Sequence, residues 1–422
     1  MHNLANGGIF AVTNRMLYSL HALQRQFFGP VADLSGTWAA WLRGSSALPG
    51  RWMHANLSLL HRSTKDFPGP SFGITSVSAH GEHVDVVEET VETHPFCRLV
   101  RFARVGRDPA TVAALAADPR VLVCAPLSGH HPTLLRDTVA TLLQDHDVHV
   151  TCWIDAREVP VERGAFHLGD YVGVIRRFIA TLDATRLHVV SVCQPTVPVL
   201  AAVALAAAAS EPTPRSLTLM GGPIDARQSP TVVNKLATDH PLAWFETAMI
   251  HRVPVGHPGV GRAVYPGFLQ LAAFVMMNPE RHADAYRTYW SDLVAGRDGT
   301  AHEKFYDEYN AVLDMDAAYY LDTVRVVFQE FALARGTWDV AGVRVRPAAI
   351  TRTALFTIEG AHDDISGPGQ TAAAHALCDG IPAARKRSLV ADCGHYGLFS
   401  GSRWREAIYP ELRVFIRDHE AA

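Results

Sequence analysis

The sequence predicts an α/β fold in which helices cover both faces of a mainly parallel central sheet and a helical insertion interrupts that sheet. Short runs rich in Val and Leu alternate with helical segments from Cys97 onward, which is the pattern of strand–helix–strand units. The runs Val121–Cys124 and His188–Val192 are apolar almost throughout, as expected for strands buried on both faces. From about residue 225 to 345 the alternation gives way to helical, aromatic-rich sequence.

The composition is that of a folded protein without an affinity for nucleic acid. The 422 residues are 48% hydrophobic and 19% charged, which allows a large core. The 38 basic and 42 acidic side chains give a net charge of −4, so no positive excess neutralises phosphates. The six cysteines stand singly, without the C-x-x-C spacing of zinc or redox sites. We expect most of them to be reduced core residues of a cytoplasmic protein.

Residues 1–70 form a predicted N-terminal helical segment. The apolar residues Met16, Leu17, Leu20, Leu23 and Phe27 recur at helical spacing. Phe28–Pro30 supplies a stop, and a second helical stretch follows at Trp38–Leu42. Residues 1–11 lack the basic start, apolar core and cleavage site of a signal peptide. The longest apolar stretch, residues 197–209, is too short for a transmembrane span, which needs about 20 residues.

The predicted core consists of two parts that flank the insertion. Residues 71–224 form its first part, with helices that start near Leu134 and Gly169 and strands at Cys97–Phe102, Val121–Cys124, Val148–Trp153, Leu187–Val192 and Ser216–Met220. Residues 225–345 form a helical cap. Residues 346–422 form the second part, with strands at Ala354–Ile358 and Arg387–Val390 and helices at Gln370–Cys378 and Trp404–Ile416.

Cys193 lies where a nucleophile elbow is expected, between an apolar strand and a helix of small residues. In such an elbow the nucleophile projects from the top of the sheet, and the next backbone N–H, here that of Gln194, faces the developing oxyanion. The usual pattern is G-x-S-x-G, whereas this chain has Ser191-Val-Cys-Gln-Pro195. The alternative interpretation is a buried free cysteine at a strand end.

Two later segments supply the partners that a cysteine nucleophile needs. Asp363 and Asp364 follow the strand Ala354–Ile358, and the G-x-x-D spacing favours Asp363, although an aspartate there can also simply cap a helix. His395 stands on a glycine-bracketed loop after the last strand. The order nucleophile, acid, histidine is that of α/β-hydrolases, with His395 as base and the aspartate fixing its tautomer.

The loop after Val121–Cys124 is the predicted source of a second oxyanion donor. Hydrolases of this type supply a backbone N–H there, and Leu127 and Ser128 are the candidates. The alternative is a simple turn with His130 and His131 facing solvent. We expect no metal at these two histidines, because further spaced ligands are lacking.

At these residues the chain resembles the intracellular poly(3-hydroxybutyrate) depolymerases, whose elbow carries cysteine in a V-C-Q-P-x-x-P pattern. Val192-Cys-Gln-Pro-Thr-Val-Pro198 matches this pattern. The resemblance extends to five further segments that are spread along most of the chain: Met16–His21, Ala125–His130, Val232–Leu236, Tyr265–Leu269 and Asp363–Gly367.

The resemblance implies an enzyme that hydrolyses ester bonds of short-side-chain polyhydroxyalkanoate in amorphous granules, through an acyl intermediate on Cys193. It implies Asp363 or its neighbour as acid, His395 as base, no cofactor, and granule association in the cytoplasm; a homo-oligomer stays open. Two alternatives remain: a polyhydroxyalkanoate synthase-like acyltransferase, although that elbow is G-x-C-x-G, and an inactive granule-coating protein. The cap and the N-terminal helix are the two candidates for granule contact.

Overall fold

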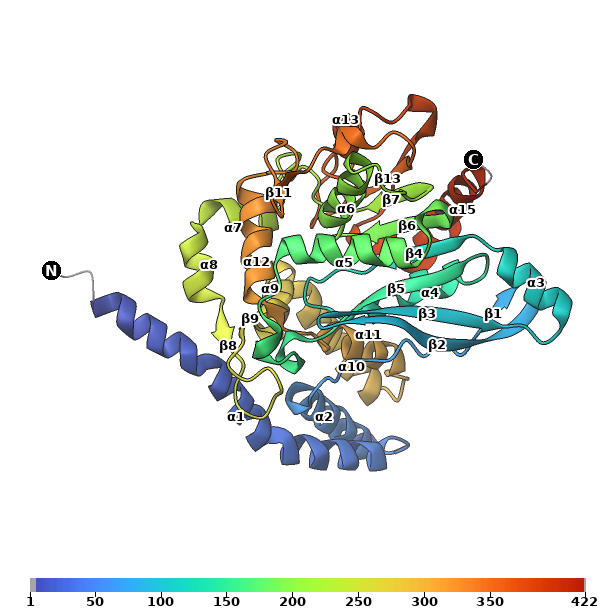
Figure 1. Ribbon diagram of the computed structural model, residues 1–422. Coiled ribbons are helices and arrows are strands. Elements are labelled where there is room, and N and C mark those ends of the chain that lie inside the picture. The colour runs from blue at the N-terminus through green and yellow to red at the C-terminus, as the bar shows by residue number, and fades with distance from the viewer. Residues whose placement is uncertain (1–4, 421–422) are drawn as a thin grey trace.

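A nine-stranded sheet forms the centre of the protein (Figure 1). The computed structural model describes residues 5–420, with side chains from Tyr18 onward. Residues 1–4, on which part of the signal-peptide expectation rests, and the predicted contributions of the Met16 and Leu17 side chains lie outside this description.

The strands follow the spatial order β1-β2-β3-β5-β4-β6-β7-β13-β14. The first three strands pair antiparallel, and β3 also runs antiparallel to β5; the remaining pairs from β5 to β14 are parallel. This confirms the predicted mainly parallel sheet. The bounds are β1 (Ser76–Ala79), β2 (Glu82–His94), β3 (Cys97–Val105), β4 (Arg120–Cys124), β5 (Asp147–Trp153), β6 (Leu187–Val192), β7 (Ser216–Met220), β13 (Ala354–Gly360) and β14 (Lys386–Ala391).

Helices cover both faces of the sheet, and each face has its own apolar core. On one face α5 (Leu168–Thr181) and α6 (Thr196–Ala208) pack against Leu122 and Leu217. On the other, α4 (Arg136–Leu142) and α15 (Tyr409–Asp418) pack against Val123 and Phe356. Short helices complete the connections of the core: α3 (Pro109–Ala117), α13 (Ala374–Leu377) and α14 (Gly401–Arg403). Strands buried on both sides explain the continuous apolar runs in the sequence.

The segment between β7 and β13 is largely helical, as the loss of alternation predicts. Its helices are α7 (Val232–Asp239), α8 (Leu242–Ala248), α9 (Gly267–Met277), α10 (Pro279–Val294), α11 (Thr300–Asn310) and α12 (Ala317–Asp322). Two small sheets accompany them, one of β8 (His251–Arg252), β9 (Ala263–Tyr265) and β10 (Met315–Asp316), the other of β11 (Asp339–Val340) and β12 (Val343–Arg344). We call this segment the cap.

The N-terminal segment is a helical hairpin of α1 (Ala5–Leu42) and α2 (Leu48–Thr64). The predicted stop at Phe28–Pro30 is wrong, because Pro30 lies inside α1 and the helix continues through Trp38. A proline inside a helix costs about 3 kcal/mol, which packing against another element must offset. Here the second half of α1 packs on α2: His54 Nδ1 lies 2.8 Å from the Ala39 carbonyl oxygen and His61 Nδ1 lies 2.8 Å from that of Ala32.

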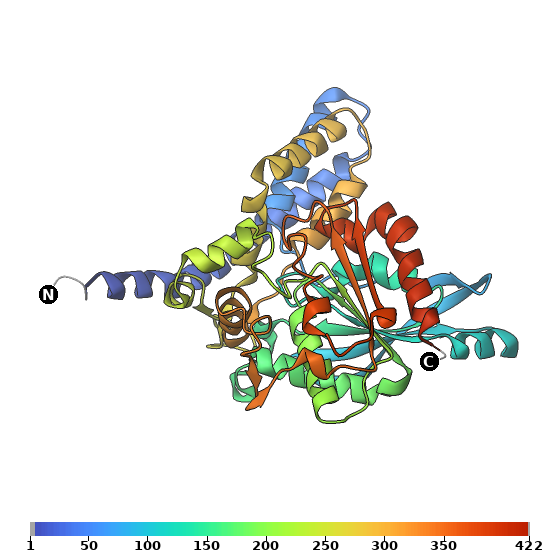
Figure 2. The same ribbon diagram turned by 90° about the horizontal axis from the view of Figure 1, so that it is seen from above.

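In the part of the chain that the structure describes, no helix is both long enough and apolar enough to cross a membrane, α1 included. The N-terminal part of α1 extends well beyond the rest of the molecule (Figures 1 and 2).

Candidate active site

Cys193 occupies a strained turn between β6 and α6. Its φ is 69°, in the left-handed region that non-glycine residues seldom adopt, and such strain typically costs about 1–3 kcal/mol. Its N–H donates to the Met220 carbonyl (2.7 Å), and its own carbonyl accepts from the N–H of Thr196 (3.2 Å). This strand–turn–helix geometry is that of a nucleophile elbow, despite the absence of the G-x-S-x-G pattern.

Two glycines after β7 make room for this turn. A Cβ at Gly222 would overlap Thr196 Oγ1 and lie 2.5 Å from the Cys193 carbonyl oxygen. Gly221 has a φ of 54°, and a Cβ there would lie 3.3 Å from His395 Cε1 and 3.4 Å from Asp363 Oδ2. The elbow therefore obtains its space from the neighbouring strand end instead of from glycines beside the cysteine.

Asp363 and His395 form a buried pair at the ends of β13 and β14. His395 Nδ1 lies 2.7 Å from Asp363 Oδ2. The other carboxylate oxygen, Oδ1, accepts from the N–H groups of Ile365 (2.9 Å) and Ser366 (2.8 Å). Asp364 is exposed and lies 3.5 Å from Asn278 Nδ2. The structure therefore brings Asp363, and not Asp364, to the histidine.

The parallel sheet explains why these distant residues meet. In the register, Val192 pairs with Met220, Met220 with Ile358, and Gly360 with Ala391. Each site residue follows the carboxyl end of one of these strands, so all of them lie at one edge of the sheet.

The electrostatics of His395 favour its protonated form. Burial by itself lowers its pKa, but the charge of Cys193, hydrogen bonds with Asp363 and Cys193, and the charge of Asp363 together raise the pKa of His395 from 6.5 to about 10. An imidazolium between a carboxylate and a thiolate is the arrangement that activates cysteine nucleophiles.

The predicted oxyanion donors lie in two strand-end loops, after β4 and after β6. Leu127 is buried and Ser128 is half-buried in the loop after β4, which neighbours β6 in the sheet. Gln194 is half-buried at the turn before α6. Among the described residues, none accepts a hydrogen bond from the backbone N–H of Gln194, Leu127 or Ser128.

The histidines of the β4 loop do not both face solvent. His130 is buried against the rings of Phe274 and Tyr309, and burial lowers its pKa to about 4. His131 is half-buried, and burial likewise lowers its pKa to about 4. Among the described residues no group of three potential ligands could hold a metal ion, at these histidines or elsewhere.

A cleft of about 1110 Å³ opens beside His395. Cap helices α9, α10 and α11 form one wall, and the loops after β13 and β14 form the other. His395 lines the cleft, whereas Cys193 does not line it and stays half-buried behind it. The lining is rich in aromatic and histidine side chains: Phe274, His282, Phe305, Tyr306, Tyr309 and Tyr396.

Sequence reasoning did not assign a role to several residues of this site. Gly221 and Gly222 are visible in the sequence only as a strand end, and the lining of the cleft by α10 and α11 depends on tertiary packing. The Gly-Gly-Pro that follows an apolar strand was the one available signal.

Three features have the arrangement of an α/β-hydrolase fold: the sheet order, in which β5 precedes β4, the tight turn at Cys193 after β6, and the Asp363–His395 pair after β13 and β14. Residues 221–420 match the family model described as PHB de-polymerase C-terminus. This part of the chain is similar to that family, and the match supports an enzyme that hydrolyses esters.

Solved structures with similar folds are hydrolases of several kinds. A putative lipase from Acinetobacter baumannii AYE has a TM-score of 0.44 and 11% identity, and covers 79% of this chain and 93% of its own. A putative aryl esterase from Burkholderia cenocepacia has a TM-score of 0.42 and 15% identity, with coverages of 80% and 100%. A 2-hydroxy-6-oxo-6-phenylhexa-2,4-dienoate hydrolase from Rhodococcus sp. strain RHA1 has a TM-score of 0.42 and 14% identity, and the match covers 79% of this chain and 99% of that one. No curated protein matches the chain.

Proposed function

We propose that this protein is a polyhydroxybutyrate depolymerase that hydrolyses ester bonds of the polymer through an acyl intermediate on Cys193. The family match over residues 221–420 supports the polymer as substrate. The observation that carries the mechanism is the buried Asp363–His395 pair, whose histidine interacts with a cysteine on a strained elbow.

In the acylation step, the Cys193 thiolate attacks the ester carbonyl carbon. The carbonyl oxygen gains negative charge, which the N–H groups of Gln194 and of Leu127 or Ser128 stabilise. When the tetrahedral intermediate collapses, the ester C–O bond breaks and His395 gives its proton to the departing alkoxide. The products are a thioester on Cys193 and a chain that ends in a hydroxyl group.

In the deacylation step, neutral His395 takes a proton from water, and the resulting hydroxide attacks the thioester carbonyl. Collapse of the second tetrahedral intermediate releases the acid and restores the thiolate–imidazolium pair. Asp363 keeps its place throughout, because two backbone N–H groups hold the oxygen that does not contact His395. The reaction needs no cofactor.

In this proposal the segments of the chain have different roles. The core parts 71–224 and 346–422 supply the sheet and all reacting groups, and residues 225–345 supply one wall of the substrate cleft. The N-terminal segment 1–70 contributes the helical hairpin of α1 and α2, which packs on the cap. The aromatic lining of the cleft suits a neutral, partly apolar polyester chain, because such pockets bind mainly through apolar contact.

The test is product analysis with the purified full-length protein on amorphous polyhydroxybutyrate granules, with and without coenzyme A. Hydrolysis predicts free 3-hydroxybutyrate or its oligomers in both conditions. Release of coenzyme A thioesters only when coenzyme A is present would identify an acyltransferase instead. Granule binding without any products, together with no turnover of a soluble ester, would identify a coating protein.

A further inference from the structure

Helix α1 has an inverted distribution of side chains. A surface helix normally buries its large apolar residues and exposes its polar ones. In α1 the buried positions after Tyr18 are the small residues Ala32, Ser35 and Ala39. Six large apolar side chains are instead more than half exposed, up to 76% for Phe27 and Trp41; these residues, which we call the α1 stripe, are Leu20, Leu23, Phe27, Leu34, Trp38 and Trp41.

The α1 stripe lies on the side of the helix that faces away from the protein. Its members are separated by three, four or seven positions, so at 100° per residue they share one face. The buried residues Ala32, Ser35 and Ala39 lie on a different face, about 120° around the helix axis, where α2 approaches closely. A Cβ at Gly36 would lie only 2.7 Å from His61 Nδ1, which shows how tight this contact is.

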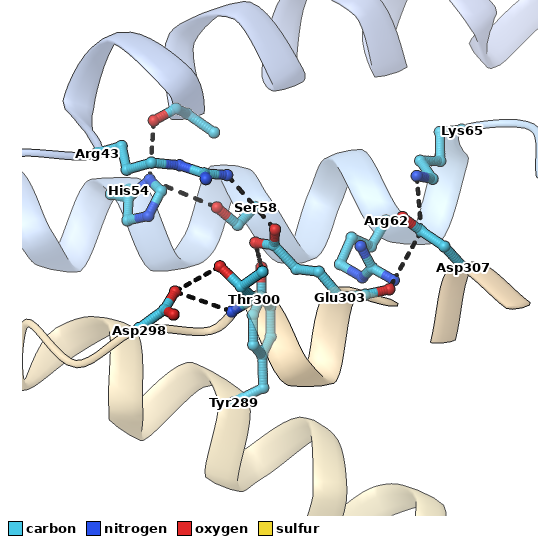
Figure 3. A network of polar contacts seen from close by, with 11 residues as sticks. Arg43, His54, Ser58, Arg62, Lys65, Tyr289, Asp298, Thr300, Glu303 and Asp307 are labelled. Atoms are coloured by element: carbon cyan, nitrogen blue, oxygen red, sulfur yellow. Dashed lines mark hydrogen bonds and ion pairs between the residues drawn. The ribbon is translucent and has the colours of Figure 1, made fainter. Parts of the chain in front are cut away.

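Charged and hydrogen-bonding groups hold the hairpin to the cap and leave the α1 stripe free of them. Figure 3 shows the contacts between the hairpin and α10–α11. Arg62 and Lys65 both pair with Asp307 (3.0 and 2.8 Å), and Arg43 pairs with Glu303 (3.5 Å). Nearer the start of α1, His21 stacks on the Phe268 ring, with 4.2 Å between the ring centroids.

The charged residues within the span of the stripe point elsewhere. Arg25 donates to the Lys65 carbonyl (2.5 Å), toward the end of α2. At 100° per residue, Asp33 lies about 80° around the helix from the nearer edge of the stripe. The outward face of α1 between Leu20 and Trp41 is consequently neutral and rich in large apolar side chains.

The large apolar side chains that the cap exposes are aliphatic except for Phe305: Val232, Leu236, Val255, Val260, Met276 and Val343. Of the Phe and Trp residues at 225–345, all of which the structure describes, Phe305 alone is exposed, and it lines the cleft. The other cap aromatics are buried or half-buried. Of the two candidates for granule contact, the exposed aromatic surface therefore belongs to the N-terminal helix.

We propose that the α1 stripe is the surface by which the protein adsorbs to its insoluble polyester. This inference rests on the proposed function for the identity of the polymer. A neutral, apolar polyester surface matches a face without charges, and desolvation of large exposed side chains supplies the binding energy. The protruding position of α1 lets it lie on a broad surface without hindrance from the sheet domain (Figures 1 and 2).

A second copy of the chain fits the stripe less well than the polymer. Helix pairing needs side chains that interlock at a continuous repeat. In α1, Leu20, Phe27, Leu34 and Trp41 recur every seven residues, but the exposed Pro30 occupies the intervening position between Phe27 and Leu34, where such a repeat needs a second large apolar side chain. Adsorption to a flat surface needs no register, so this interruption does not hinder it.

The test compares adsorption of two variants to amorphous granules by co-sedimentation. Both carry Cys193→Ala, so that binding is measured without hydrolysis. One adds Phe27→Gln, Trp38→Gln and Trp41→Gln; the matched control adds Val232→Gln, Val255→Gln and Met276→Gln, three exposed apolar residues of the cap that do not line the cleft. We expect the stripe variant to lose about 100-fold or more in affinity, because three large apolar side chains stay unburied, and the control to change by about twofold at most.

Three results would overturn the inference: equal adsorption of both variants, stronger binding of the parent to neutral phospholipid vesicles than to polyester, or a dimer in sedimentation that the stripe substitutions dissociate. In the presence of Cys193, turnover of a soluble ester should be the same with and without the stripe substitutions, which also reports on folding. If that turnover falls, the triple variant is misfolded, and the adsorption comparison is made with Trp41→Gln as the only stripe substitution. A parent protein that adsorbs through the stripe but cleaves no ester would refute the proposed function and leave this inference standing.

Discussion

The Nδ1–H of His395 donates to Oδ2 of Asp363 across 2.7 Å, although the two residues are 32 positions apart. This bond fixes which imidazole nitrogen carries the proton on the acid side, so the other nitrogen is left for Cys193. The function proposed for the site depends on this orientation.

Replacing Asp363 by asparagine should lower kcat for a soluble ester by about 10²- to 10⁴-fold, since an amide can hold the wrong histidine tautomer even when the geometry survives. Asp364→Asn is the matched control, because Asp364 lies on the cleft wall and does not contact His395. Its activity should stay within about threefold of the parent. Steady-state kinetics of the two variants tests this assignment. A larger loss of kcat in Asp364→Asn than in Asp363→Asn would transfer the acid role to Asp364.

Cys193→Ala should abolish esterase activity, by about 10³-fold or more, because no other group on the elbow can form the acyl intermediate. The fold should persist, since an alanine fits the same space. Cys393→Ala is the control: this second half-buried cysteine contacts Gly397 near the site but has no role in the mechanism. Near-normal turnover by Cys193→Ala, in protein free of parent enzyme, would exclude the cysteine as nucleophile.

The alkaline side of the pH profile should report on His395. Acylation needs its proton for the departing alkoxide, and its pKa is raised to about 10. We expect kcat/KM for a soluble ester to be sustained on the alkaline side until the pH approaches that value. In Asp363→Asn the fall should move to lower pH, because a group that raises the pKa is lost.

The same shift predicts a pH dependence of stability. The folded-state pKa of about 10 exceeds the ordinary value of 6.5, so protonated His395 stabilises the fold fully below about pH 6.5. This contribution is lost as the pH rises through that window towards 10. Thermal unfolding of the parent and of His395→Gln should therefore differ in slope between these pH values. Parallel curves would mean that His395 is neutral in the folded protein.

Gly222→Ala should impair catalysis and stability together. Its Cβ would press on the Cys193 carbonyl, which is backbone and cannot move aside cheaply. We expect a loss of roughly 1–3 kcal/mol in unfolding free energy and a fall in kcat of about tenfold or more, because the elbow must shift. Gly173→Ala in α5 is the control, since nothing lies within 4 Å of its Cβ position. It should stabilise the protein by about 0.5–1 kcal/mol. Denaturant unfolding and kinetics measure both effects, and a fully active Gly222→Ala enzyme would contradict this account of the elbow.

The parallel part of the fold could be predicted because its strands are buried on both faces. A continuous apolar run such as Leu187–Val192 can be recognised in the sequence as a buried strand. Strands β1 and β2 were not predicted: β2 buries only Val84 and Val86, and acidic residues fill much of its exposed face. The length of α1 was also missed, because Pro30 is tolerated only through packing on α2, which local sequence does not reveal.

The site could be predicted as far as chain order and strand ends determine it. Cys193, Asp363 and His395 each follow a recognisable strand, and parallel strands bring their carboxyl ends to one edge. The choice between Asp363 and Asp364 depended on a turn geometry that only the structure provides. The burial of His130 and the cap wall of the cleft depend on contacts between segments that are far apart in sequence, which no local pattern records.

The most direct test of the central claim is the identification of the residue that becomes acylated. The parent enzyme is mixed with a chromogenic 3-hydroxybutyrate ester, quenched in acid within the first turnover, digested and examined by mass spectrometry. We predict a 3-hydroxybutyryl group on the peptide that contains Cys193, with its loss on treatment with hydroxylamine, as expected for a thioester. An acyl group on a serine, or burst release of the alcohol with Cys193 unmodified, would contradict the mechanism.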